Sequence, residues 1–132
     1  MNNVKPVSVP LSSHFKISSS LCPNTNEEKE YKSQIPYANT VGSLMYVMVC
    51  TRPDISHAVG VVSRYMENPG KKHWSTVKWV LRYLRGTSDY CITYNKSSEF
   101  FCRYVDSDFA SDLDKRRSTS GHIITLAGGA TS

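Results

Sequence analysis

Residues 51–86, TRPDISHAVGVVSRYMENPGKKHWSTVKWVLRYLRG, decide the fold expected for this chain. Apolar side chains recur there every three or four residues, which is the spacing of one helix face. The stretch predicts two amphipathic helices separated by Asn68-Pro69-Gly70, because proline disfavours helix in the residue before it. Thr51 is expected to cap the first helix, and Gly86 is expected to follow the second, which covers about residues 73–85.

The regions on the N-terminal side of this stretch differ from each other. Residues 36–50 repeat the helical spacing with Val41, Leu44 and Met48, so a compact unit of three helices is expected over residues 36–86. Residues 1–35 are rich in proline and polar side chains and have little apolar area to bury. They are expected to form an extended or disordered leader.

The apolar period changes after residue 87. Residues 90–94 and 100–106 are rich in aromatic and β-branched side chains and flank a polar turn, which predicts a hairpin; residues 122–126 predict a third strand. Three strands with no helix to cover one face are marginally stable. The expected fold class is therefore α+β, with a three-helix unit followed by an incomplete antiparallel sheet over residues 87–132.

The charge and the apolar runs of the chain limit the classes of partner that are expected. The chain has 132 residues and a net charge of +5, and residues 68–132 hold ten Lys and Arg against six Asp and Glu. A basic half is compatible with a polyanion partner. The longest apolar run is too short to span a bilayer, so no membrane partner is expected. No apolar run of signal-peptide length is visible, and no motif indicates a cofactor.

A basic stripe is the main candidate binding feature. Lys71, Lys78, Arg82 and Arg85 share one face of the helix over residues 73–85 if that helix starts early, and the stretch around them contains no acid. Such a stripe can follow a phosphate backbone. The neighbouring Trp79 and Tyr83 are expected either to stack on bases or to lie in the core behind an ordinary solvated face.

Four aspartates, Asp106, Asp108, Asp112 and Asp114, form the candidate acidic cluster. The cluster does not fit a calcium loop, because its fifth, sixth and twelfth positions are Ala110, Ser111 and Arg117. A two-metal nuclease site needs carboxylates from several separate elements. The cluster is therefore expected to be solvated and to hold no metal.

Cys91 and Cys102 fall opposite each other if the predicted hairpin forms. They are expected to be reduced, half-buried thiols, and the spacing leaves their redox state open.

Three long strings carry a family resemblance: KPVSVPLSSHFK at 5–16, the string from IPYANTVGSLMYVM to RYLRGTSDY at 35–90, and YVDSDFASDLDKRRSTSGHIITLAGGATS at 104–132. Together they resemble the Pol polyprotein of copia-type retrotransposons. The resemblance implies the C-terminal region of the reverse transcriptase running into the start of an RNase H-like domain. It implies that the basic helix belongs to the part that holds the template–primer duplex.

The same resemblance implies an absence of catalysis. The polymerase metal motif of the family lies upstream, and of four RNase H carboxylates only the first is carried over, as a vestigial Asp106. Two-metal hydrolysis needs both ions held, so one carboxylate is insufficient. The leading hypothesis is a catalytically incomplete Pol fragment that acts, if at all, by binding, with no catalytic residue and no enzymatic activity.

A second resemblance lies inside the first. Arg82-Tyr83-Leu84-Arg85 is similar to the R-x-L-R signature of oomycete secreted effectors, which enter host plant cells and suppress cell death or immunity. This alternative implies secretion, then the host cytoplasm or nucleus, and host plant proteins as partners. The leading hypothesis leaves localisation open. In the helical interpretation, Leu84 is a core residue and both arginines belong to the basic stripe, which accounts for the motif by structure alone.

Overall fold

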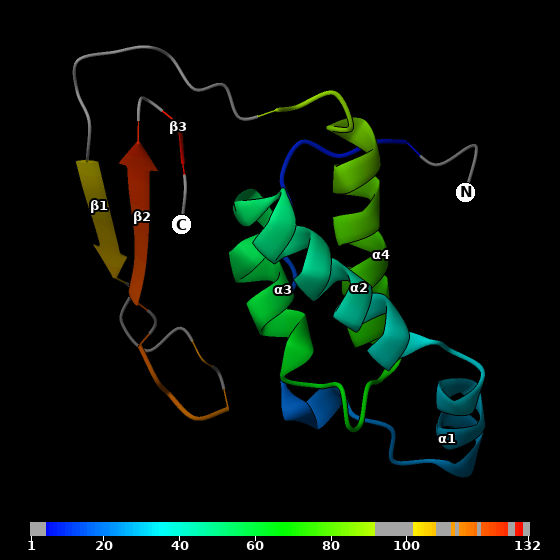
Figure 1. Cartoon of the computed structure of the whole chain (residues 1–132). Coiled ribbons are helices and arrows are strands. Elements are labelled where there is room, and N and C mark those ends of the chain that lie inside the picture. The colour runs from blue at the N-terminus through cyan, green and yellow to red at the C-terminus, as the bar shows by residue number, and fades with distance from the viewer. Residues whose placement is uncertain are drawn as a thin grey trace. The chain divides into compact units, whose positions relative to one another are not determined.

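The fold is α+β, with helices in one part of the chain and an antiparallel sheet in the other (Figure 1). The computed structural model describes residues 5–91, 102–107, 112, 114–118, 120–126 and 129–130. The chain divides into two compact units, residues 1–88 and 89–132. Within the described residues, no helix combines the length and apolarity needed to cross a bilayer.

The first unit contains the helices predicted from the apolar spacing. Its described elements are η1 (Ser19–Leu21), α1 (Asn26–Ser33), α2 (Tyr37–Cys50), η2 (Pro53–Ile55), α3 (Ser56–Ser63) and α4 (Lys71–Gly86). The helices α2, α3 and α4 correspond to the three expected, and Gly86 is the last residue of α4 rather than the residue after it. The short helix α1, which begins with a capping box of Thr25 and Glu28, lies within the residues expected to form an extended or disordered leader.

The expected cap at Thr51 is wrong. Thr51 follows the end of α2, and its hydroxyl donates to the carbonyl of Val47 at 3.3 Å. Pro53 then opens η2, where its missing N–H costs nothing because the first turn has no partner for that group. The backbone thus leaves α2 and enters α3 through a short 3-10 turn.

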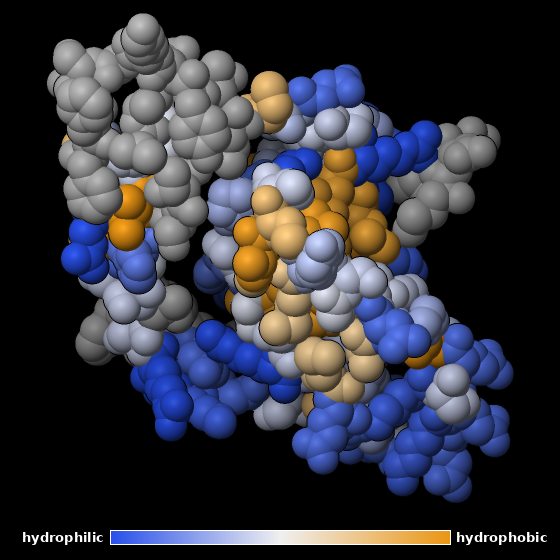
Figure 2. Space-filling model, in the orientation of Figure 1, coloured by the Kyte–Doolittle hydropathy of each residue, from blue (hydrophilic) through white to orange (hydrophobic). Residues whose placement is uncertain are grey.

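The core of this unit lies between α2, α3 and α4. Its fully buried aliphatic side chains are Val41, Ile55, Ala58, Val59, Val62, Val77 and Val80. Tyr37 completes it, because its ring is buried and its hydroxyl donates to the carbonyl of Val62 at 2.8 Å. Figure 2 shows apolar residues gathered over the middle of the helical unit, with charged residues around them.

Residues 5–21, here called the N-terminal strap, run antiparallel to α4. Near the strap's beginning, the carbonyl of Lys5 accepts a hydrogen bond from Arg82; near its end, the carbonyl of Ser18 lies 3.2 Å from Nε2 of His73. Ile17 is buried in the core. Most of the strap lacks regular secondary structure, as expected of the leader, but its backbone is held by α4 and contributes to the core, which the polar composition did not indicate.

Two glycines mark where the strap passes the ends of α4. A Cβ on Gly70 would overlap the carbonyl oxygen of Leu21, and a Cβ on Gly86 would lie 2.7 Å from the Cβ of Pro6. The strap therefore approaches the backbone of α4 so closely at both ends that a side chain would not fit at either glycine.

The second unit contains an antiparallel sheet with the strand order β1-β2-β3. The strands are β1 (Cys102–Ser107), β2 (Ser120–Leu126) and β3 (Gly129–Ala130), and Tyr104 pairs with Ile123. The strand expected at 122–126 is confirmed as part of β2. The predicted hairpin is not tested, because residues 92–101 lie outside the described part of the chain.

The two cysteines of this unit are free and exposed, so the expectation of half-buried thiols is wrong. Cys102 lies opposite Thr125 of β2. Cys91 lies at the end of the described helical region and has no regular secondary structure. The described sheet does not bury Cys102 because no further layer of described residues covers β1.

Candidate nucleic-acid interface

The helix α4 presents four cations along one side. Lys71, Lys78, Arg82 and Arg85 fall within about a sixth of its circumference and span about 21 Å of its axis, given 3.6 residues per turn and 1.5 Å per residue. The helix contains no acidic residue, and all of these side chains are exposed except that of Arg82, which is half-buried. We call these four residues the basic row. Its unbroken positive charge is the pattern that attracts a phosphate backbone.

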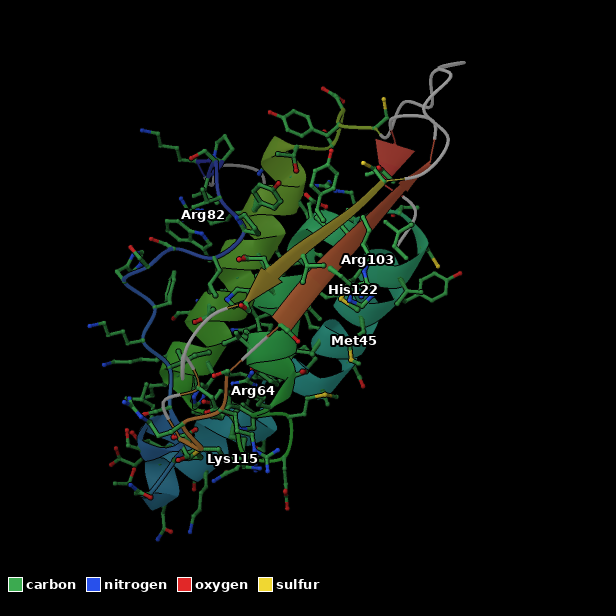
Figure 3. The ribbon with its side chains drawn as sticks, turned by 90° about the vertical axis from the view of Figure 1, so that its left-hand side faces the viewer. Met45, Arg64, Arg82, Arg103, Lys115 and His122 are labelled. Carbon is green, nitrogen blue, oxygen red and sulfur yellow. The ribbon has the colours of Figure 1, made fainter. Side chains whose placement is uncertain are left out.

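Two members of the basic row are placed by aromatic rings. The ammonium of Lys71 lies 5.4 Å from the ring centroid of Tyr31, which belongs to α1. The guanidinium of Arg82 lies 5.1 Å from the ring centroid of Trp79, and its Nε donates to the carbonyl of Lys5 at 2.9 Å. In Figure 3, Arg82 lies beside the N-terminal strap.

Trp79 and Tyr83 are both occupied by contacts inside the protein, which does not favour the expectation that they stack on bases. The indole Nε1 of Trp79 donates to the carbonyl of Val9 at 3.0 Å, and the rings of His14 and Phe15 pack against its indole, each with centroids 5.3 Å apart. The ring of Tyr83 is buried and its hydroxyl donates to Asp54 at 2.8 Å. The core alternative therefore describes Tyr83, and Trp79 serves to bind the strap.

A polar clamp fixes the C-terminal end of α4. Arg52 binds both carboxylate oxygens of Asp54, at 3.0 and 2.8 Å, and also donates to the carbonyl and the hydroxyl of Thr87, at 3.1 and 2.7 Å. The hydrogen bonds from Arg52 lower the pKa of Asp54, while burial raises the pKa of Tyr83. The clamp holds the last turns of α4, which carry Arg82 and Arg85.

Sequence reasoning missed this clamp. Nothing in the local spacing links Asp54 to Tyr83, which lies 29 residues away. Only the Arg52–Asp54 pair could have been predicted from the Thr-Arg-Pro-Asp string, because these two residues are close along the chain.

The four residues of the R-x-L-R string have different contacts and different degrees of burial. Arg82 is held by the strap, Tyr83 is buried against Asp54, and Arg85 is exposed. Leu84 is half-buried and lines a groove between α2 and α4, together with Leu44, Val47 and Leu81. The helical fold therefore keeps Arg82 and Arg85 on the side of the basic row, whereas Tyr83 and Leu84 face the core and the groove.

The aspartates of the second unit do not form a metal centre in the described part of the chain. Asp106 is exposed on β1, opposite Gly121. Asp112 is buried, and its carboxylate accepts the backbone N–H groups of Asp114 and Lys115 at 2.9 and 3.1 Å. Asp108 lies outside the described residues. No group of three or more potential metal ligands is found among the described residues.

Comparison with known proteins finds long similarities. The chain is 56% identical over all 132 residues to the retrovirus-related Pol polyprotein from transposon TNT 1-94 of Nicotiana tabacum, and covers 10% of that protein. It is 38% identical over 127 residues to the Pol polyprotein from transposon RE2 of Arabidopsis thaliana, and covers 8% of it. The chain thus spans about a tenth of the length of these Pol relatives.

A shorter relative is the secreted RxLR effector protein 161 of Plasmopara viticola. The identity is 43% over 99 residues, which is 74% of this chain and 70% of that protein. No family model and no solved structure matches the chain.

Proposed function

We propose that this chain is a segment of a retrovirus-related Pol polyprotein of the copia type, and that it binds nucleic acid through α4 and performs no catalysis. The ligand class proposed is a duplex with a regular phosphate backbone, such as an RNA–DNA hybrid. Binding through backbone charges carries no sequence preference, because phosphates are the same at every position.

The basic row is the observation that carries this proposal. It places Lys71, Lys78, Arg82 and Arg85 on one side of a helix without acids, and the clamp at Arg52 holds the end of that helix in place. Neither Trp79 nor Tyr83 presents a free ring to an unpaired base. These features support contact with the backbone of a duplex over stacking on single-stranded bases.

Charge reversal tests the basic row. The triple substitution Lys78→Glu, Arg82→Glu, Arg85→Glu is expected to abolish binding to a fluorescent RNA–DNA hybrid, and the affinity of the unmodified chain is expected to fall steeply with salt. Fluorescence anisotropy at several salt concentrations measures both effects.

A matched control separates the basic row from net charge. Substituting Lys29, Lys115 and Arg117 with Glu makes the same change in charge at exposed positions that do not belong to the basic row. This variant is expected to keep most of the affinity. Equal loss in both triple variants would reject a dedicated face on α4, and unchanged affinity of the first variant at low salt would reject binding through α4 altogether.

The proposed absence of catalysis rests on Asp106, the one family carboxylate carried over to this chain. We expect no cleavage of the RNA strand of a hybrid by the purified chain with Mg²⁺, and the same result after Asp106→Asn. A denaturing gel of labelled RNA measures this. Magnesium-dependent cleavage that disappears in the Asp106→Asn variant would contradict the proposal.

A second candidate function is that of a secreted effector acting on host plant proteins. It is favoured by the relative from Plasmopara viticola and by Arg82 and Arg85 at the R-x-L-R positions. Secretion from the source organism and suppression of cell death on expression in plant tissue are its expected results. Failure in both assays would remove this candidate.

A further inference from the structure

We propose that the N-terminal strap positions Arg82 as a pre-oriented phosphate-binding fork, so that the strap and Trp79 act on nucleic-acid binding through this one arginine. This inference rests on the proposed binding function. It assigns a role to residues 5–15, which lie more than sixty positions from Arg82 in the sequence.

The guanidinium of Arg82 is held from two directions. Its Nε donates to the carbonyl of Lys5 at 2.9 Å, and its Cζ lies over the ring of Trp79, 5.1 Å from the ring centroid. A guanidinium has five N–H groups, and this arrangement uses the one on Nε. The two terminal nitrogens are the pair that binds the oxygens of a phosphate side by side.

Trp79 is in turn fixed by the strap. Its Nε1 donates to Val9 at 3.0 Å, and the rings of His14 and Phe15 pack edge-on against its indole. The indole is therefore held in one orientation, and the guanidinium above it is constrained by that ring and by the carbonyl of Lys5. Holding the side chain before binding lowers the entropy that Arg82 loses when it contacts a phosphate.

Lys78 offers a contrast in the same basic row. Its side chain is exposed, and no hydrogen bond or ring contact to another described residue places it. Lys78 is thus expected to contribute charge without fixed geometry, and its contribution should not depend on Trp79. Comparing substitutions of Arg82 and Lys78 therefore distinguishes the effect of a positioned side chain from the effect of charge alone.

A double-substitution cycle tests the coupling. The affinity for a fluorescent RNA–DNA hybrid is measured for the unmodified chain, Trp79→Ala, Arg82→Gln and the double variant, and again with Lys78→Gln in place of Arg82→Gln. We expect Trp79→Ala to weaken binding about fivefold in the unmodified chain and in Lys78→Gln. In Arg82→Gln it should weaken binding less than about 1.5-fold, because the positioned group is gone.

Two further measurements make the test independent of a general loss of structure. Trp79→Phe keeps a ring beneath Arg82 and is expected to retain binding within about twofold, although it loses the bond to Val9. In NMR spectra of the free protein, the Nε–H of Arg82 should exchange slowly with water and should lose this protection in Trp79→Ala.

The possible outcomes distinguish this inference from the proposed nucleic-acid binding on which it rests. If the unmodified chain binds the hybrid and Trp79→Ala is equally costly with and without Arg82, the positioning role is overturned and backbone binding stands. If the Nε–H of Arg82 exchanges as fast in the unmodified chain as in Trp79→Ala, the fixed fork is overturned as well. If the unmodified chain does not bind at all, the proposed function and this inference fall together.

Discussion

The two units of this chain differ in how they hold their shape. In the helical unit, apolar side chains from three helices meet and exclude water, and Val41, Ile55 and Val62 are fully buried. In the described sheet, Tyr104, Val105 and Ile123 are exposed. Burial supplies most of the favourable free energy of folding, so the described strands rely mainly on their backbone hydrogen bonds.

Similar side chains therefore contribute differently to the free energy of folding in the two units. An isoleucine in the helical unit is enclosed on all sides, whereas one in the sheet keeps about half of its surface in water. Free energies of unfolding should therefore respond to substitutions according to the unit in which they lie.

The largest expected difference comes from two isoleucines. Ile55→Ala should lower the free energy of unfolding by about 3 kcal/mol, because it leaves a cavity in a closed core, while Ile123→Ala should change it by about 0.5 kcal/mol or less. Urea denaturation followed by circular dichroism measures both. Equal losses would mean that the sheet is as well packed as the helices.

Substitutions of two glycines test the same difference between the units. Gly70→Ala should lower the free energy of unfolding by about 2 kcal/mol, since its Cβ would overlap the carbonyl of Leu21, whereas a Cβ on Gly121 of β2 meets nothing within 4 Å. Gly121→Ala is therefore expected to stay within about 0.5 kcal/mol of the unmodified chain. Thermal unfolding of both variants checks the difference. A harmless Gly70→Ala would show that the strap does not press on α4.

The smallest expected effect concerns pH and the clamp of the helical unit. The hydrogen bonds from Arg52 lower the pKa of Asp54 in the folded chain, so its stabilisation is present above the unfolded pKa of about 4 and is lost as the pH falls through the folded value. Asp54→Asn should cost about 1 kcal/mol at neutral pH and progressively less in acid.

Denaturation midpoints measured from neutral to acid pH test this expectation. Asp106→Asn, at an exposed position of the second unit, is the matched control and should leave the pH dependence in place. An Asp54→Asn variant whose cost stays constant down to low pH would show that the clamp does not depend on the charge of Asp54.

The helices and the basic row could be predicted from the sequence because both follow from local spacing. The apolar residues Val77 and Val80 fall on one side of α4 and Lys78 and Arg85 on the other, whatever packs against them. The strand predicted over residues 122–126 from its β-branched side chains and flanking glycine forms most of β2. The capping role of Thr51 was predicted wrongly because its hydroxyl could equally well close the helix before it.

The functions of Trp79, Arg52 and the leader could not be predicted in the same way. Each depends on a partner at least 29 positions away along the chain: Val9 for Trp79, Thr87 for Arg52, and α4 for the leader as a whole. No periodicity encodes such pairs, because they form only after the helices have packed.

The sequence by itself determined the helical segments, the positive side of α4 and the likeness to transposon Pol proteins. These depend on residue type and spacing, which the chain carries before it folds. Only the tertiary structure decided that the strap covers Trp79, that Tyr83 turns inward to Asp54, and that Arg82 is held from two sides. Contacts between distant residues are selected by packing and by the need to satisfy polar groups, and neither is written in any short stretch of sequence.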